Sequence, residues 1–360
     1  MDPLTHTLVG VTLAESGLKH RTRLATATLV IGANLPDIDG VTNLLGRDTA
    51  LWIRRGWTHG VLAMVLLPAA LALAMHVWAP RGGRPRVTSF AWLLGLSYLA
   101  VLSHAALDWL NNYGIRLLMP FDTTWFYGDA VFIVDPWLWL VLGGPIALSC
   151  SRSRAGLVGW TLFGAAGTGL MFGVDAVPAA AQLCWIVGIL SLALVRVRRG
   201  AVPLPAAAVG VCLAGACLYI GGMVIGTAIA ERQVAAWTTR DRVEATAVMA
   251  GPVPANPFQR QVIVQTSTHY HLLLLDWFRE PMLRVAGPRL DRTPASPVVA
   301  AALAAPSVRG LRGWLRFPSY EVESLPEGYR VTIRDMRFAR TFASGLGTAV
   351  VELDAALRPR

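Results

Sequence analysis

The chain has 360 residues, of which 54% are hydrophobic and only 15% are charged, and this composition excludes an ordinary soluble enzyme of this size and indicates an integral membrane protein. The formal net charge of +10 comes almost wholly from arginine, since Lys19 is the only lysine. No basic stripe alternates with aromatic residues, so we expect no nucleic-acid binding.

Two short apolar stretches open the chain, over residues 5–17 and 24–35, with a basic loop over residues 19–23 between them. Each stretch has about 12 residues, fewer than the roughly 20 that a membrane-spanning helix needs. We therefore expect a short helical hairpin that packs against other helices or re-enters the membrane from one face.

Longer apolar stretches follow and predict six spanning helices, over residues 58–79, 88–110, 131–150, 156–174, 179–197 and 204–230. The loops between them contain arginines, namely Arg81, Arg84, Arg86, Arg152, Arg154, Arg196, Arg198 and Arg199. Threading the chain through these helices puts all the basic loops on one side, which the positive-inside rule assigns to the cytoplasm. The sequence predicts a multi-pass protein of the bacterial cytoplasmic (inner) membrane.

The composition changes after Ala230. The remaining chain is rich in arginine and proline, and it contains short alternating runs such as residues 261–266 and 329–334, which indicate strands. The predicted fold is an all-α polytopic membrane bundle with an N-terminal hairpin over residues 1–230. A small α+β extramembrane domain over residues 231–360 follows, on the outer, periplasmic side by the same threading.

Several residues that can do chemistry lie at the ends of the apolar stretches. His104 and Asp108 are four residues apart and would share one helix face, and such a pair in an apolar helix is costly unless it is paired or bound to a cation. Asp37 and Asp39 follow Pro36 at a turn, where two carboxylates could face a cation. We expect His59 in the first turn of the helix that begins near Thr58.

The threading also brings these residues together near the outer face, with His6 and Asp135. Such convergence is expected of a single site, and imidazole with carboxylate suits a divalent metal, zinc or alternatively manganese. Taken singly, each residue also has a structural explanation, such as a cap or a hydrogen bond between helices. Whether Asp129 and Asp135 belong to the site is left open.

Five short motifs occur in order over residues 1–140. They are M-D-P-L-T-H from Met1, L-P-D-I-D from Leu35, R-G-W-T-H from Arg55, S-H-A-A-L-D from Ser103 and D-P-W-L-W from Asp135. Together they resemble the YdjM-like family of membrane-bound metal-dependent hydrolases, and the H-x-x-x-D element is more distantly similar to the zinc-dependent phospholipase C and P1 nuclease group. Family members often carry a histidine where this chain has Arg54. The resemblance implies a metal held by His6, Asp37, Asp39, His59, His104 and Asp108.

These observations predict a hydrolase in which metal-activated water attacks an ester or phosphoester of a membrane-associated substrate, a lipid or lipid-linked molecule, at the outer face. The expected catalytic residues are Asp37, Asp39, His104 and Asp108, with Asp37 or Asp39 as general base. Arg54 or Arg55 would bind an anionic substrate. The alternative is a non-catalytic membrane protein with a structural metal and a partner-binding C-terminal domain. A channel is disfavoured because the stretches after Gly156 are nearly free of polar residues, and the oligomeric state is left open.

Overall fold

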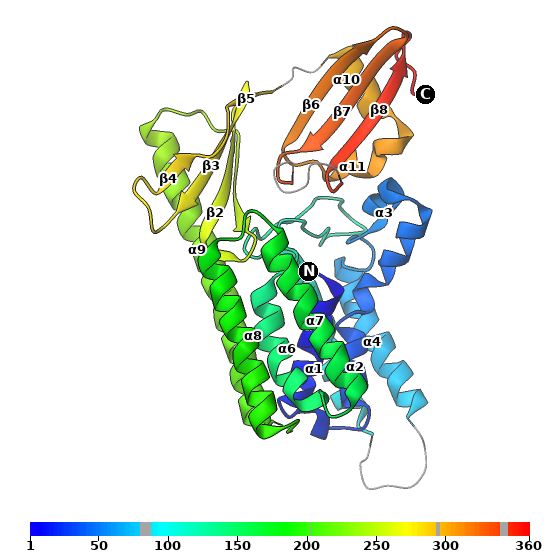
Figure 1. Ribbon diagram of the computed structural model, residues 1–360. Coiled ribbons are helices and arrows are strands. Elements are labelled where there is room, and N and C mark those ends of the chain that lie inside the picture. The colour runs from blue at the N-terminus through cyan, green and yellow to red at the C-terminus, as the bar shows by residue number, and fades with distance from the viewer. Residues whose placement is uncertain (80–87, 203, 293–295, 339–344) are drawn as a thin grey trace. The chain divides into compact units, whose positions relative to one another are not determined.

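The computed structural model describes residues 1–79, 88–202, 204–292, 296–338 and 345–360 (Figure 1). Its contacts divide the chain into two compact units. The bundle unit comprises Met1–Ile38, Arg55–Gly226 and Pro252–Pro257, and the sheet unit comprises Asp39–Arg54, Thr227–Gly251 and Phe258–Arg360. These units differ from the ranges 1–230 and 231–360 chiefly because residues 39–54 belong to the sheet unit.

The bundle unit begins with the short hairpin that the sequence predicts. Helix α1 (Pro3–Glu15) and helix α2 (Ala25–Gly32) flank the 3₁₀ turn η1 (Leu18–His20), and α1 packs against α2. The α1 helix starts where it does because the Asp2 side chain accepts a hydrogen bond from the Thr5 backbone N–H and Pro3 needs no such partner. Helix α2 also packs against α5 (Phe90–Trp109), which carries two of the site residues.

Five helices among the described residues are long and apolar enough to cross a membrane. They are α4 (Val61–Trp78), α5, α7 (Arg154–Gly173), α8 (Ala179–Arg199) and α9 (Ala206–Arg240). The sequence predicted six, but the helix expected over residues 131–150 is the 15-residue α6 (Pro136–Cys150). It is shorter because the Asp135 side chain caps it and Pro136 occupies its first position.

The outward faces of these helices remain apolar. Leu66 on α4, Leu190 on α8 and Leu218 on α9 are all more than half exposed. The inward faces of α1, α5, α6 and α9 form a cluster that includes Leu8, Leu107, Leu138, Leu142 and Met223. Helices that are apolar on both their inner and outer faces are typical of membrane bundles, which agrees with the predicted fold class.

The basic loops that the structure describes lie at one end of the bundle unit. Arg196 donates hydrogen bonds to the side chain and carbonyl of Ser151, at 2.8 and 2.7 Å. At the same end, the Ser89 N–H donates to Thr22 Oγ1, and a Cβ at Gly17 would lie 3.9 Å from the Ala206 Cβ. The predicted loop with Arg81, Arg84 and Arg86 lies outside the described residues.

The C-terminal part of the chain forms two antiparallel sheets, in agreement with the predicted small α+β domain. Among the described residues, β1 (Ala247–Val253), β2 (Asn256–Gln265), β3 (His269–Asp276) and β4 (Leu283–Val285) pair in that order, and β5 (Leu290–Asp291) also pairs with β3. The register places Val262 opposite Leu273. The second sheet has the order β6 (Pro318–Leu325), β7 (Gly328–Asp335), β8 (Thr348–Asp354). Helix α10 (Pro297–Ala304) contacts all three strands of the second sheet, and the turn η3 (Pro306–Val308) follows it.

Residues 39–54 pack against this C-terminal part. The Asp48 carboxylate at the start of α3 (Arg47–Ile53) accepts hydrogen bonds from the backbone N–H groups of Gly310 and Leu311, at 2.9 and 3.0 Å. These groups open α11 (Arg309–Trp314), and the Arg309 guanidinium stacks 3.9 Å from the centre of the Trp52 ring. The sheet unit therefore includes a segment from the N-terminal part of the sequence, which composition alone did not indicate.

Candidate metal centre

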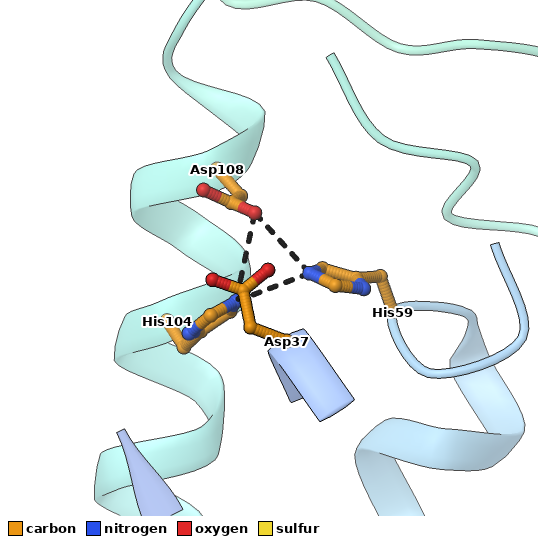
Figure 2. Close-up of side chains that lie close together, drawn as sticks. All are labelled: Asp37, His59, His104 and Asp108. Atoms are coloured by element: carbon orange, nitrogen blue, oxygen red, sulfur yellow. Dashed lines mark hydrogen bonds and ion pairs between the residues drawn. The ribbon is translucent and has the colours of Figure 1, made fainter. Parts of the chain in front are cut away.

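Four side chains from three separate segments converge in the bundle unit (Figure 2). Asp37 comes from the 3₁₀ helix η2 (Leu35–Leu45), His59 from the turn before α4, and His104 and Asp108 from α5. One ligand atom from each residue lies within 4.8 Å of the other three, and these four form the only such group of three or more among the described residues. His59, His104 and Asp108 are fully buried, whereas the Asp37 side chain is 9% exposed.

The separations within this group suit a single divalent ion. The Nε2 atoms of His59 and His104 are 3.1 Å apart, and they lie 3.2 and 3.5 Å from Asp108 Oδ2. The nearest Asp37 oxygen lies 4.0 Å from His104 Nε2. Two nitrogens bound tetrahedrally to zinc at 2.0–2.1 Å would be about 3.3–3.4 Å apart. The two imidazoles therefore need only a small adjustment to share an ion.

The proton position on His104 also favours a cation. His104 Nδ1 lies 2.7 Å from the Ala33 carbonyl oxygen, which can only accept a hydrogen bond, so Nδ1 carries the proton of the neutral ring. The Nε2 lone pair then faces the other three residues, as in histidine ligands whose second nitrogen donates to a backbone carbonyl. His59 Nδ1 lies 2.9 Å from Thr58 Oγ1, a hydroxyl that can donate or accept.

His59 lies slightly outside its predicted position. It precedes α4 instead of occupying the first turn of that helix, because Gly60 is the N-cap and the helix begins at Val61. Gly60 packs tightly against the next loop, where a Cβ would lie 2.3 Å from the Met119 carbonyl oxygen. This close approach requires glycine and fixes the turn that presents His59.

His6 lies beside the group of four without belonging to it. Its ring on α1 stacks on His104, with ring centres 3.7 Å apart and planes 20° apart, and its Nε2 lies 3.2 Å from Asp108 Oδ1. The Met1 amino nitrogen contacts the same oxygen. His6 Nδ1 is buried and has no hydrogen-bond partner among the described residues. A ligand role for His6 stays a prediction.

Asp39 is separated from Asp37 by the local backbone. On a 3₁₀ helix each residue turns by about 120°, so side chains two positions apart point in different directions. Asp39 lies in the sheet unit, where its Oδ1 is 3.6 Å from Arg54 Nε. The group of four contains Asp37 and not Asp39.

Arg55 has contacts that the sequence did not suggest. Its side chain is only 4% exposed, and its Nε and one terminal nitrogen lie 3.0 Å from Oδ2 and Oδ1 of Asp108, respectively. The other terminal nitrogen donates to Asn111 Oδ1 at 3.2 Å. The sequence assigned no role to Asn111 or to the Ala33 carbonyl, and a backbone carbonyl leaves no signal in a sequence.

The two aspartates left open lie outside the group of four. Asp135 caps α6 and accepts a hydrogen bond of 2.8 Å from the Tyr219 hydroxyl on α9. Asp129 is buried with a positive φ of 49°.

In the sheet unit, His269 and His271 face each other with their Nε2 atoms 3.0 Å apart, while Arg289 contacts His269 Nδ1 at 2.7 Å. Because a guanidinium can only donate, His269 carries its own proton on Nε2, which disfavours a metal there.

Comparison with known proteins gives one family and one relative. A family model described as YdjM inner membrane protein matches residues 1–197. A Bacillus subtilis (strain 168) protein named "Uncharacterized protein YfhP" is 25% identical over 176 residues, a match that covers 45% of this chain and 50% of that protein. The chain thus matches about half the length of this relative. No solved structure matches significantly, and the distant similarity to phospholipase C and P1 nuclease is not found.

Proposed function

The chain belongs to the YdjM family of inner membrane proteins, and we propose that it is a membrane-bound metal-dependent hydrolase. The observation that carries this proposal is the convergence of Asp37, His59, His104 and Asp108 within 4.8 Å. Two imidazoles and two carboxylates whose ligand atoms converge in this way form a donor set that suits a divalent cation.

Zinc is the metal we propose, with manganese as the alternative. Two imidazole nitrogens with carboxylate oxygens form a typical zinc ligand set, and the fixed proton on His104 Nδ1 leaves its Nε2 ready for a metal. When bound, such a metal polarises the oxygen of the scissile bond and lowers the pKa of its bound water to about 7.

Within this proposal the four residues have different tasks. His59, His104 and Asp108 are fully buried and would hold the metal. Asp37 is the most exposed of the four, so substrate and water would approach from its side, and its carboxylate would accept the proton of the attacking water. Asp39 as an alternative base and Arg54 as a substrate-binding residue stay predictions.

A membrane-associated ester or phosphoester, carried by a lipid or a lipid-linked molecule, is the proposed substrate class. The basic loops lie at one end of the bundle unit, near Ser89 at the start of α5, whereas His104 and Asp108 lie 15 and 19 residues further along α5. At 1.5 Å per residue, His104 and Asp108 lie about 22–28 Å along the helix axis from Ser89, which is nearly the thickness of the hydrocarbon core. By the positive-inside rule the site would open at the outer face. The C-terminal domain, which follows α9, would lie on that side too.

A structural metal site is the second candidate. Three of the four ligands are fully buried, and closed sites of this kind are typical of structural zinc. In that case the C-terminal domain would bind a partner and the bundle would be its anchor.

Metal analysis together with a hydrolysis assay tests the proposal. Purified wild-type protein should contain zinc or manganese and release product from a chromogenic ester or phosphoester in detergent micelles. The double variant Asp37→Asn/His104→Ala should lose both, whereas the matched variant His76→Ala/Asp175→Asn, at two exposed positions outside the group, should keep both. Metal without turnover would favour the structural candidate. Equal, near-zero metal in wild type and the first double variant would refute the metal site.

A further inference from the structure

Arg55 forms a bidentate ion pair with the Asp108 carboxylate. Nε lies 3.0 Å from Oδ2 and a terminal nitrogen lies 3.0 Å from Oδ1, and both side chains are almost completely buried. Paired bonds of this kind fix the plane of a carboxylate as well as its position. The last torsion of an aspartate side chain is otherwise broad, so this ion pair, together with the contacts of the Met1 amino nitrogen and His6 Nε2 at Oδ1, restricts where Oδ2 points.

We propose that Arg55 is a positioning residue of the metal centre, which holds Asp108 so that Oδ2 faces His59 and His104. This inference rests on the proposed metal site. In this role Arg55 orients a proposed metal ligand, whereas its charge had suggested that it binds substrate.

The loop after α5 holds the Arg55 side chain in turn. Asn111 Oδ1 accepts from Arg55 at 3.2 Å and also from the backbone N–H groups of Tyr113 and Gly114, at 2.8 and 3.2 Å. The Gly114 carbonyl accepts from Arg55 at 3.3 Å, and the Tyr113 ring lies 4.4 Å from the guanidinium carbon. Asn111 lies three residues after Asp108, so one guanidinium ties the end of α5 to the loop that follows it.

The backbone of Arg55 is fixed as well. Its φ is +53°, a left-handed conformation that is unfavourable for a residue with a Cβ. Its carbonyl accepts a hydrogen bond of 2.8 Å from the Arg116 N–H. The next residue, Gly56, packs against the Arg116 guanidinium, which a Cβ would approach to 2.6 Å. Backbone strain of this kind persists where the surroundings enforce it, and it is common at functional sites.

Lysine could not replace Arg55 in this role. An ammonium is a point charge that cannot form two parallel bonds to one carboxylate, whereas the planar guanidinium can. Arg55→Lys therefore keeps the charge and loses the orientation. Residues that orient metal ligands typically contribute a factor of 10–100 to metal affinity.

The test compares metal binding by full-length wild type, Arg55→Lys and the control Arg21→Lys in detergent micelles. Arg21 is exposed and stacks 5.1 Å from the Trp92 ring, so it reports the general effect of an arginine-to-lysine change. Zinc affinity is measured by chelator competition, and Co²⁺ absorption in the visible range reports the ligand geometry. We expect Arg55→Lys to bind zinc 10–100-fold more weakly with a changed Co²⁺ spectrum, and Arg21→Lys to match wild type.

The outcomes separate this inference from the proposed function. If Arg55→Lys matches wild type in affinity and spectrum, the positioning role is wrong and the metal site stands. If wild type binds neither zinc nor Co²⁺, the metal site and the positioning role are both wrong. Should Arg55→Lys fail to fold, Tyr113→Leu removes the stacking partner and keeps the ion pair. A severalfold loss of zinc affinity is then expected, and wild-type affinity would overturn the inference.

Discussion

Asp108→Asn is the most informative single substitution in the bundle. It keeps the size of the side chain, removes its negative charge and replaces one oxygen with an NH₂ group that donates. In wild type the two carboxylate oxygens accept from Arg55 at 3.0 Å each, and His6 and His59 approach them to 3.2 Å. Because Arg55 contacts both oxygens, the asparagine would turn its NH₂ group toward Arg55 whichever way the amide is oriented, and at the same time toward either His59 or His6.

The size of the effect follows from the burial of Arg55. With 4% of its side chain exposed, the guanidinium would lose its anion and stay out of water. Breaking a buried ion pair by removing one partner costs about 3–5 kcal/mol. We expect the free energy of unfolding of the metal-free protein to fall by about this amount. Zinc binding should weaken at the same time because one proposed ligand is lost.

Chemical unfolding in detergent micelles, followed by tryptophan fluorescence, measures the first effect, and chelator competition measures the second. Asp135→Asn is the matched control, since Asp135 is also buried and asparagine caps helices about as well as aspartate. It should change stability by less than about 1 kcal/mol and leave zinc binding intact. If Asp108→Asn behaves like this control, the carboxylate does not organise the site and our reasoning about it is wrong.

Three further predictions concern metal removal, pH and the sheet unit. Wild type with free zinc at 100 times its dissociation constant should be about 2.7 kcal/mol more stable than after chelation, and equal unfolding midpoints would contradict this. Burial alone would raise the pKa of Asp335, but the Arg337 ion pair and backbone hydrogen bonds lower it below its ordinary value. The ionised carboxylate therefore stabilises the folded state above pH about 4, and this contribution disappears as the pH falls through the lowered pKa. Arg337→Gln should therefore flatten the acid limb of a pH–stability curve, and an unchanged limb would argue against the pair. Asp48→Ala should destabilise the start of α11 by about 1 kcal/mol and speed amide exchange at Gly310 and Leu311, and unchanged exchange at both amides would contradict this. Asp48→Asn keeps only one acceptor oxygen, so it should speed exchange at one of the two amides.

The separation of His104 and Asp108 could be predicted from the sequence because it depends only on helix geometry. Residues four apart on an apolar helix share a face, and their Nε2 and Oδ2 atoms do lie 3.5 Å apart. The nearness of His59 followed from threading the basic loops, and the structure places it 3.1 Å from His104. Neither step required knowledge of side-chain packing.

The position of Asp39 and the contacts of Arg55 could not be predicted in this way. The D-x-D pattern gives no indication that its backbone would be a 3₁₀ helix, which turns Asp39 away from Asp37. An arginine beside a candidate site can bind substrate or orient a ligand, and only the contacts of its guanidinium distinguish the two. These contacts depend on the left-handed backbone of Arg55 and on the loop at Asn111.

The sequence by itself determined the membrane bundle, the short hairpin, the C-terminal sheets and the residue types of a candidate metal centre. Hydrophobicity, strand alternation and helical spacing are local properties, so they can be read along the chain. Tertiary structure alone decided that Ala33 fixes the proton of His104, that Arg55 pairs with Asp108, and that residues 39–54 pack with the sheet unit. Each of these depends on hydrogen bonds or packing that no local pattern encodes, and several of them join segments far apart in the sequence.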